Sequence, residues 1–161
     1  MVTRDQILNW LEEVSDPEIP VLSVVDLGVV RDAQFDENSW LITITPTYSG
    51  CPAMQVMEED IISKLHEKGV LNVNIRTILS PAWTTDWLSE KGRQKLREYG
   101  IAPPEHEVDK SVLFSEPTVV PCPKCMSRNT RMVSQFGSTA CKAHYQCNNC
   151  QEPFDYFKCL K

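Results

Sequence analysis

Four cysteines near the C-terminus form two pairs with the spacing of metal ligands. Two residues separate Cys122 from Cys125, Cys147 and Cys150 repeat that spacing, and residues 126–146 lie between the pairs. Two intervening residues let one tight turn direct both sulfurs at the same ion, and four thiolates satisfy tetrahedral zinc. The pattern therefore predicts a zinc ribbon with a structural zinc ion. A rubredoxin-like iron centre would use the same number of ligands.

A fifth cysteine, Cys51, stands between a strand-like segment, 40–45, and a helix-like segment, 54–68. Gly50 allows a sharp turn, and Pro52 is favoured in the first turn of a helix. A thiol there would meet unpaired N–H groups and the positive end of the helix dipole, which predicts a thiolate able to bind metal or attack an electrophile. The alternative is a small buried hydrophobic residue.

The remaining polar candidates carry weaker patterns. Asp16 and Glu18 alternate with prolines, so they are either acid–base groups or the turn that ends a helix. Both leftover cysteines are interpreted as packing residues within strands, and the histidines as surface residues or a spare ligand. These residues are Cys141, Cys159, His66, His106 and His144.

Apolar periodicity and turn residues predict the elements that must position these groups. Thr3 and Gln6 have the spacing of a capping box at the start of a first helix, and Gly69 is a typical residue after a helix end. Helices on one side of a small sheet form a two-layer α+β domain. The predicted strands are 29–35, 40–45 and 70–79, and the later helices are 54–68 and 86–99, the last interrupted at Gly92.

The composition divides the chain into two domains. Residues 1–100 form the α+β domain, 101–120 a linker, and 121–161 an all-β zinc ribbon. Within the ribbon we expect strands at 130–136, 141–145 and 152–160, with Phe154, Tyr156 and Phe157 in a small core. So small a domain depends on its metal to fold.

The charge and hydropathy of the chain narrow the classes of partner. A net charge of −6 argues against a protein that binds nucleic acid by neutralising phosphates. No apolar run approaches the roughly 18 residues of a membrane span, and the N-terminus has no secretory signal pattern. We therefore expect a cytoplasmic protein with reduced cysteines that binds other proteins.

Three motifs together resemble a known family. Asp16-Pro17-Glu18 follows the first helix, Asp26-Leu27-Gly28 precedes the first strand, and T-Y-S-G-C-P at 47–52 precedes the second helix. Over residues 5–79 these resemble the SufT-like iron–sulfur assembly family. S-P-A-W-T-T-D-W at 80–87 and the cysteine-rich tail extend the likeness to nearly the whole chain, which is similar to the D-subunit family of the ring 1,2-phenylacetyl-CoA epoxidase system. His144 departs from the apolar residue expected there.

The resemblance implies an accessory protein of aerobic phenylacetate degradation. Its task would be to mature an iron–sulfur or iron centre, with the [2Fe–2S] cluster of the system's reductase as the first candidate. Cys51 would be the transient cluster or iron ligand, and Asp16, Glu18 and Thr47 would shape the pocket around it. The implied partners are the reductase or other epoxidase subunits, iron–sulfur carrier proteins and a second copy of this chain.

Two other functions stay open at this stage. One is an electron-transfer or structural subunit of the epoxidase complex, which would follow if the ribbon binds redox-active iron. The other is catalysis with Cys51 as nucleophile, against which no histidine lies at a recognisable spacing. One thiolate cannot hold a cluster, which normally has four protein ligands, so a non-catalytic assembly factor would share its cargo with partner thiols.

Overall fold

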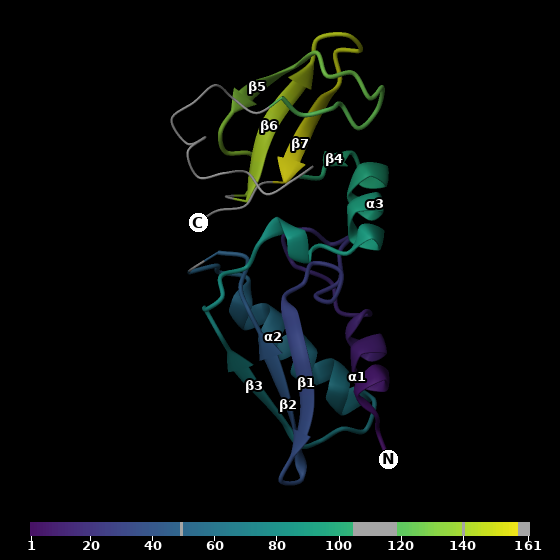
Figure 1. Cartoon of the computed structure of the whole chain (residues 1–161), viewed down its shortest axis with the longest axis vertical. Helices are drawn as coiled ribbons and strands as arrows, with labels where there is room; N and C mark the ends of the chain where they lie inside the picture. Colours follow the sequence, from purple (N-terminus) through teal and green to yellow (C-terminus); the bar gives the residue numbers. More distant parts are fainter. Residues whose placement is uncertain (49, 105–118, 140, 158–161) are drawn as a thin grey trace. The chain divides into compact units, whose positions relative to one another are not determined.

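The structure, a computed structural model, describes residues 1–48, 50–104, 119–139 and 141–157 (Figure 1). The chain divides into two compact units. The first unit contains Met1–Trp83 and Trp87–Gly92, and the second contains Thr84–Asp86 and Arg93–Lys161. Within the part of the chain that the structure describes, no helix has both the length and the apolar character needed to cross a membrane.

The first unit contains two helices and three strands. The predicted capping box is present, because the Thr3 side chain accepts a hydrogen bond from the Gln6 amide and the Gln6 side chain accepts one from the Thr3 amide. Gly69 adopts a φ of 88° directly after the second helix, as predicted for the residue after a helix end. The elements are α1 (Arg4–Leu11), β1 (Val30–Asp36), β2 (Ser39–Ile44), α2 (Met54–Glu67) and β3 (Val73–Thr77).

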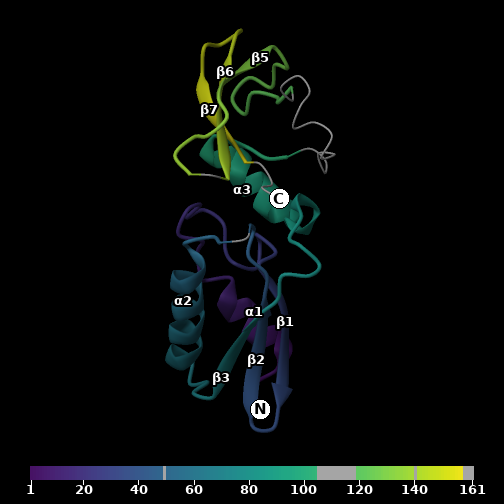
Figure 2. The same ribbon diagram turned by 90° about the vertical axis from the view of Figure 1, so that its left-hand side faces the viewer.

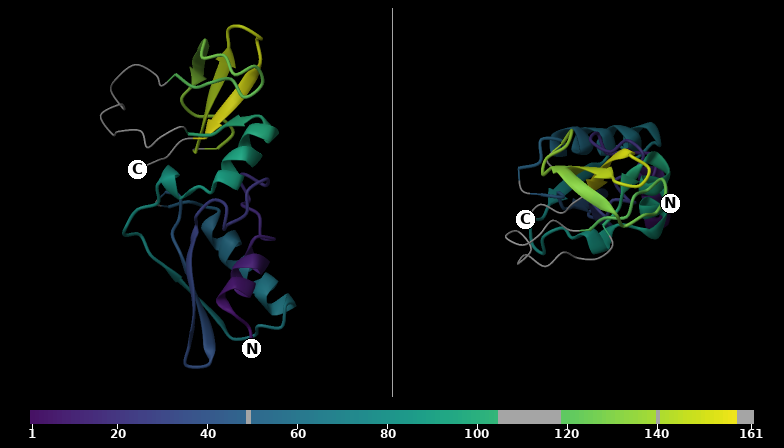
Figure 3. Two further views of the ribbon diagram at one scale, coloured as in Figure 1. Left: turned by 45° about the vertical axis from the view of Figure 1, so that its right-hand side comes forward. Right: turned by 90° about the horizontal axis from the view of Figure 1, so that it is seen from above.

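The three strands form a sheet in the order β1-β2-β3. β1 and β2 pair antiparallel as the predicted hairpin, and β3 pairs parallel with β2 after the crossover through α2. Both helices cover the same face of this sheet (Figures 2 and 3). The buried residues between the layers recur every three or four positions in the helices and every second position in β2: Ile7, Leu11, Met57, Ile61, Leu65, Trp40, Ile42 and Ile44. The predicted α+β layer pair is therefore confirmed.

The segment after β3 differs from the prediction. A short 3₁₀ turn, η1 (Thr85–Trp87), precedes α3 (Glu90–Tyr99), and Gly92 lies inside that helix without interrupting it. A Cβ atom at Gly92 would lie 3.2 Å from the carbonyl oxygen of Asp26. Gly92 therefore allows close approach of two backbone segments, which is a tertiary requirement that the local pattern does not show.

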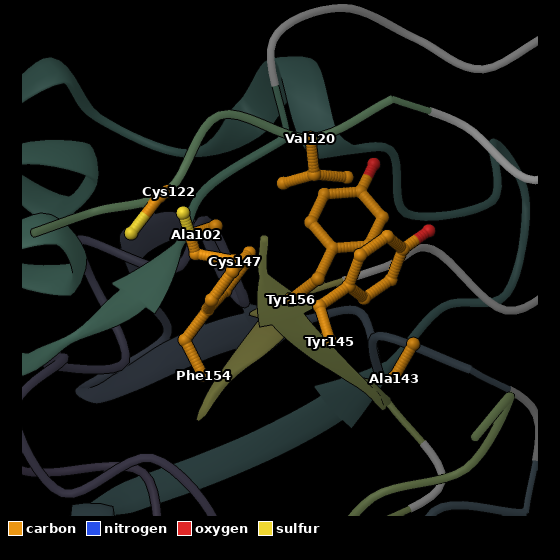
Figure 4. Packing of buried hydrophobic residues seen from close by; sticks show 8 residues of the cluster. All are labelled: Ala102, Val120, Cys122, Ala143, Tyr145, Cys147, Phe154 and Tyr156. Carbon is orange, nitrogen blue, oxygen red and sulfur yellow. The ribbon is translucent and has the colours of Figure 1, made fainter. Parts of the chain in front are cut away.

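The second unit contains a four-stranded sheet in the order β4-β7-β6-β5. Its strands are β4 (Ile101–Ala102), β5 (Thr130–Ser134), β6 (Lys142–Cys147) and β7 (Pro153–Phe157). Residues 101–102, which the sequence places in the linker, pair parallel with β7. Figure 4 shows the buried cluster of this unit, in which the Tyr145 ring packs 5.8 Å from Phe154 and 5.7 Å from Tyr156 between ring centroids.

The predicted aromatic core of the ribbon is confirmed, since Phe154, Tyr156 and Phe157 are all buried. Cys141 is also buried, with its Sγ 3.0 Å from the Thr139 hydroxyl, in agreement with a packing role. Two further candidates from the sequence, Cys159 and His106, lie outside the described residues.

Candidate functional site

The four paired cysteines of the second unit lie together. Their sulfur atoms are all within 4.8 Å of one another. The Sγ atoms of Cys122 and Cys150 are 3.7 Å apart, and those of Cys125 and Cys147 are 3.6 Å apart. Zinc–sulfur bonds of about 2.3 Å in a tetrahedron require sulfur–sulfur separations of about 3.8 Å, so the four side chains fit one zinc ion.

Two backbone turns present these sulfurs. The amide of Met126 donates to the Cys122 carbonyl over 2.8 Å, and Met126 itself has a φ of 62°. In the second turn, the Cys150 amide lies 3.5 Å from the Cys147 Sγ, and this hydrogen bond is the largest cause that lowers the pKa of Cys147. The two thiols titrate together: the Glu152 amide lowers the pKa of Cys150, but burial and the neighbouring thiols outweigh it and raise that pKa. A lowered pKa favours the thiolate that a metal requires.

Asparagine side chains join the two turns beside the sulfurs. Asn129 donates to Asn149 over 2.9 Å, Asn148 donates to Asn129 over 3.0 Å, and Asn149 donates to the Ser127 hydroxyl over 2.7 Å. Cys122 and Cys147 are buried, whereas Cys125 and Cys150 are exposed. The metal site therefore lies at the edge of the aromatic core (Figure 4) and is open to solvent on one side.

Cys51 lies on the connection between β2 and α2 in the first unit. Gly50 has a φ of 77°, which supports the predicted sharp turn. The helix begins at Met54 with Ala53 as its N-cap, so Cys51 and Pro52 precede the first turn instead of lying in it. The Cys51 amide donates to the Tyr48 carbonyl over 3.3 Å, and the Cys51 carbonyl accepts from the Met54 amide over 3.3 Å.

The prediction of a thiolate at Cys51 is wrong. The side chain is only 8% exposed, and burial is the largest cause that raises the pKa of the thiol above its ordinary value of 9.0. Hydrogen bonds from the Ala53 amide and Tyr48 act in the opposite direction, while the negative charges of Glu18 and Asp16 raise the pKa further. Burial therefore favours the protonated thiol over the thiolate.

Asp16 has a structural role in the turn that follows α1. Its Oδ1 accepts hydrogen bonds from the amides of Glu18 and Ile19 over 2.8 and 2.7 Å, so the carboxylate caps the proline-flanked turn. The same turn brings the Asp16 and Glu18 charges close enough to act on Cys51. Thr47, the fourth residue of the predicted pocket, is buried on the connection that leads to Cys51.

Three features near this region were not predicted from the sequence: a buried hydroxyl that is unpaired among the described residues, and the contacts of two residues from recognised motifs. Thr45 is 1% exposed, and its hydroxyl has no hydrogen-bond partner among the residues that the structure describes. Buried Asp26 accepts a hydrogen bond from the Ser89 hydroxyl over 3.1 Å, and the Trp83 indole donates to the Leu27 carbonyl over 2.9 Å. The motifs that contain Asp26 and Trp83 are visible in the sequence, but the contacts that these residues make join segments far apart along the chain.

Comparison with known proteins finds a matching family for each of the two parts of the chain. A family model described as an iron–sulfur cluster assembly protein matches residues 4–75, and one described as the PaaD zinc beta ribbon domain matches residues 106–158. The chain is 48% identical to an Escherichia coli (strain K12) protein provisionally named as the D subunit of 1,2-phenylacetyl-CoA epoxidase, over 96% of this chain and 92% of that protein. This chain belongs to the same D-subunit family.

The D-subunit resemblance predicted from the sequence is therefore confirmed, and further relatives match the first unit. A protein of Porphyromonas gingivalis named Fe-S protein maturation auxiliary factor is 35% identical over 58% of this chain and 90% of its own length. A domain of unknown function from Bacillus anthracis superposes with a TM-score of 0.54 at 29% identity, covering 58% of this chain and 90% of that structure. A conserved hypothetical protein of Thermotoga maritima gives a TM-score of 0.50 at 33% identity, covering 59% and 94%.

Proposed function

We propose that this D-subunit family member is a non-catalytic accessory factor that helps load iron or an iron–sulfur cluster into a protein of the phenylacetyl-CoA epoxidase system. The observation that carries the proposal is the position of Cys51, at a strand-to-helix connection of the iron–sulfur assembly domain, with Asp16 and Glu18 acting on its thiol. The first candidate client is the reductase of that system, and the cytoplasm, where thiols stay reduced, suits this task.

The chemistry of Cys51 suits a transient ligand. A metal binds the thiolate, so binding to a neutral thiol must release a proton, and reprotonation favours release of the metal. The Asp16 and Glu18 charges oppose a bare thiolate but attract a cationic cargo. Since one thiolate cannot hold a cluster, the other ligands would come from a carrier protein, the client or a second copy of this chain.

The second unit would have a different task. Cys122, Cys125, Cys147 and Cys150 would hold zinc as a closed four-thiolate site, which supplies folding free energy and leaves no open coordination position. A ribbon made rigid in this way would be the docking module for the client. We therefore assign cargo handling to the first unit and docking to the second.

The substitution Cys51→Ser tests the proposal. The hydroxyl is nearly the same size as the thiol but is a much poorer ligand for iron–sulfur species. Cells that carry this variant and express the epoxidase proteins should yield reductase with reduced iron and sulfide per chain and should lose phenylacetyl-CoA oxidation. The matched control is Cys141→Ser, which changes a buried cysteine of the other unit and should leave the reductase loaded.

Unfolding of each purified variant separates a ligand role from a packing role. If Cys51 contributes only to packing, Cys51→Ser should lower the stability of the first unit and leave reductase loading normal. A destabilised variant with fully loaded reductase would thus remove Cys51 from the mechanism.

A further inference from the structure

Residues from the segment after β3 grip one loop of the first unit. We call Trp83 and Trp87–Gly92 the clasp, and residues 22–29 the gripped loop. Trp83, which is 2% exposed, donates its indole N–H to the Leu27 carbonyl over 2.9 Å. The Ser89 amide donates to the Asp26 carbonyl over 2.9 Å, and the Ser89 hydroxyl donates to the Asp26 carboxylate over 3.1 Å.

Trp87 contacts the next residue of the same loop, Gly28. A Cβ atom at Gly28 would lie 2.5 Å from the Trp87 carbonyl oxygen, so the loop and the clasp are in direct backbone contact there. The Arg31 guanidinium lies 3.6 Å from the centroid of the Trp87 ring, a cation–π contact that helps to fix that ring. Leu27 and Gly28 therefore each contact a tryptophan of the clasp.

The gripped loop is bonded at both ends to the region of Cys51. At its start, the Leu22 carbonyl accepts a hydrogen bond from the Asp16 amide over 2.8 Å. At its end, the Val29 carbonyl accepts one from the Thr45 amide over 2.9 Å, where β2 leads into the connection to Cys51. One hydrogen bond thus fixes the turn that carries the two carboxylates, and the other fixes the end of β2, from which the chain leads to Cys51.

We infer that Trp83 is a positioning residue for the Cys51 site: its hydrogen bond to Leu27 fixes the loop that holds Asp16 on one side and Thr45 on the other. The inference rests on the proposed function, since it assigns the clasp a role in positioning the proposed metal ligand Cys51. Loss of the indole N–H would leave the Leu27 carbonyl without this donor inside a protein core, which costs free energy that opening of the loop would recover.

The test compares Trp83→Phe with Trp40→Phe in the full-length, zinc-loaded protein. Both changes replace a buried tryptophan of the first unit, but Trp40 lies at the beginning of β2 and outside the clasp. In Trp83→Phe, the amides of Asp16 and Thr45 should exchange hydrogen faster by on the order of tenfold than in Trp40→Phe. Alkylation of Cys51 by iodoacetamide should accelerate by a similar factor.

Equal exchange and alkylation rates in the two variants would overturn the inference, because Trp83 would then contribute only to overall stability. If Trp83→Phe does not fold, Ser89→Ala removes the side-chain hydrogen bond to Asp26 and should produce the same pattern with a smaller increase. An unchanged rate in that variant would likewise overturn the inference.

Reductase loading separates this inference from the function on which it rests. Loss of iron and sulfide with both Cys51→Ser and Trp83→Phe supports the two together. Loss with Cys51→Ser alone overturns the positioning role and leaves the proposed function intact. Normal loading with Cys51→Ser overturns the proposed function, whatever the exchange rates in Trp83→Phe.

Discussion

The substitution Gly28→Ala measures how tightly the gripped loop and the clasp fit. Gly28 has a φ of 78°, and an added Cβ would lie 2.5 Å from the Trp87 carbonyl oxygen and 2.7 Å from the Trp87 Cβ. The left-handed conformation costs alanine about 1–2 kcal/mol, and loss of freedom in the unfolded chain offsets about 0.4–1 kcal/mol of that. Overpacking adds about 1–3 kcal/mol, so the first unit should lose about 3 kcal/mol in total.

Gly69→Ala is the matched control. Gly69 has a φ of 88°, but no atom lies within 4 Å of the position that its Cβ would occupy. Only the conformational cost remains, and it should be about 1 kcal/mol. The difference between the two variants, about 2 kcal/mol, therefore reports the contact with Trp87 alone.

Urea unfolding followed by tryptophan fluorescence measures this difference. All four tryptophans, Trp10, Trp40, Trp83 and Trp87, belong to the first unit, so the signal follows that unit. The midpoint of Gly28→Ala should lie below that of Gly69→Ala by on the order of 1 M urea. Coincident midpoints would refute the close packing of Trp87 on Gly28 and weaken the case for the clasp.

Two further predictions concern the thiols. Elemental analysis should find one zinc ion per chain. The Cys122→Ser variant should lose this zinc and unfold the second unit without changing tryptophan fluorescence. One iron ion per chain with visible thiolate absorption would favour electron transfer instead. Because burial raises the Cys51 pKa above 9.0, the stability from its protonated thiol is complete below pH 9 and is lost as the pH rises through the raised pKa. Alkylation of Cys51 should therefore reach half its maximum rate above pH 9, and a midpoint at or below pH 9 would contradict the burial argument.

Local signals were sufficient for most of the fold. The capping box of Thr3 and Gln6 and the helix stop at Gly69 each depend on residues within one turn, so the chain near them decides the outcome. The paired C-x-x-C turns belong to the same class, because two short turns determine where four sulfurs can point.

Other features depend on contacts between distant segments. The local sequence predicts a helix break at Gly92, but the close approach of Asp26 explains why glycine is required there. Ile101–Ala102 form a strand only because they pair with β7. The pKa of Cys51 follows the same rule. The helix terminus favours a thiolate, but the tertiary structure buries the thiol and brings two carboxylates near it, and neither effect has a signature at positions 50–52.

The four ribbon cysteines and Cys51 differ chemically. This difference decides which of the two sites is suited to transfer of a metal. The ribbon thiols form a closed set of four, and a backbone amide lowers the pKa of one of them, Cys147. A metal held by four thiolates leaves only after several bonds break, which suits retention. Cys51 offers a single buried thiol whose protonated form is favoured, so any metal that it binds competes with a proton and depends on ligands from another molecule. Under the proposed function, metal transfer at Cys51 would therefore require a partner, whereas a zinc ion held by the four ribbon thiolates would be retained throughout.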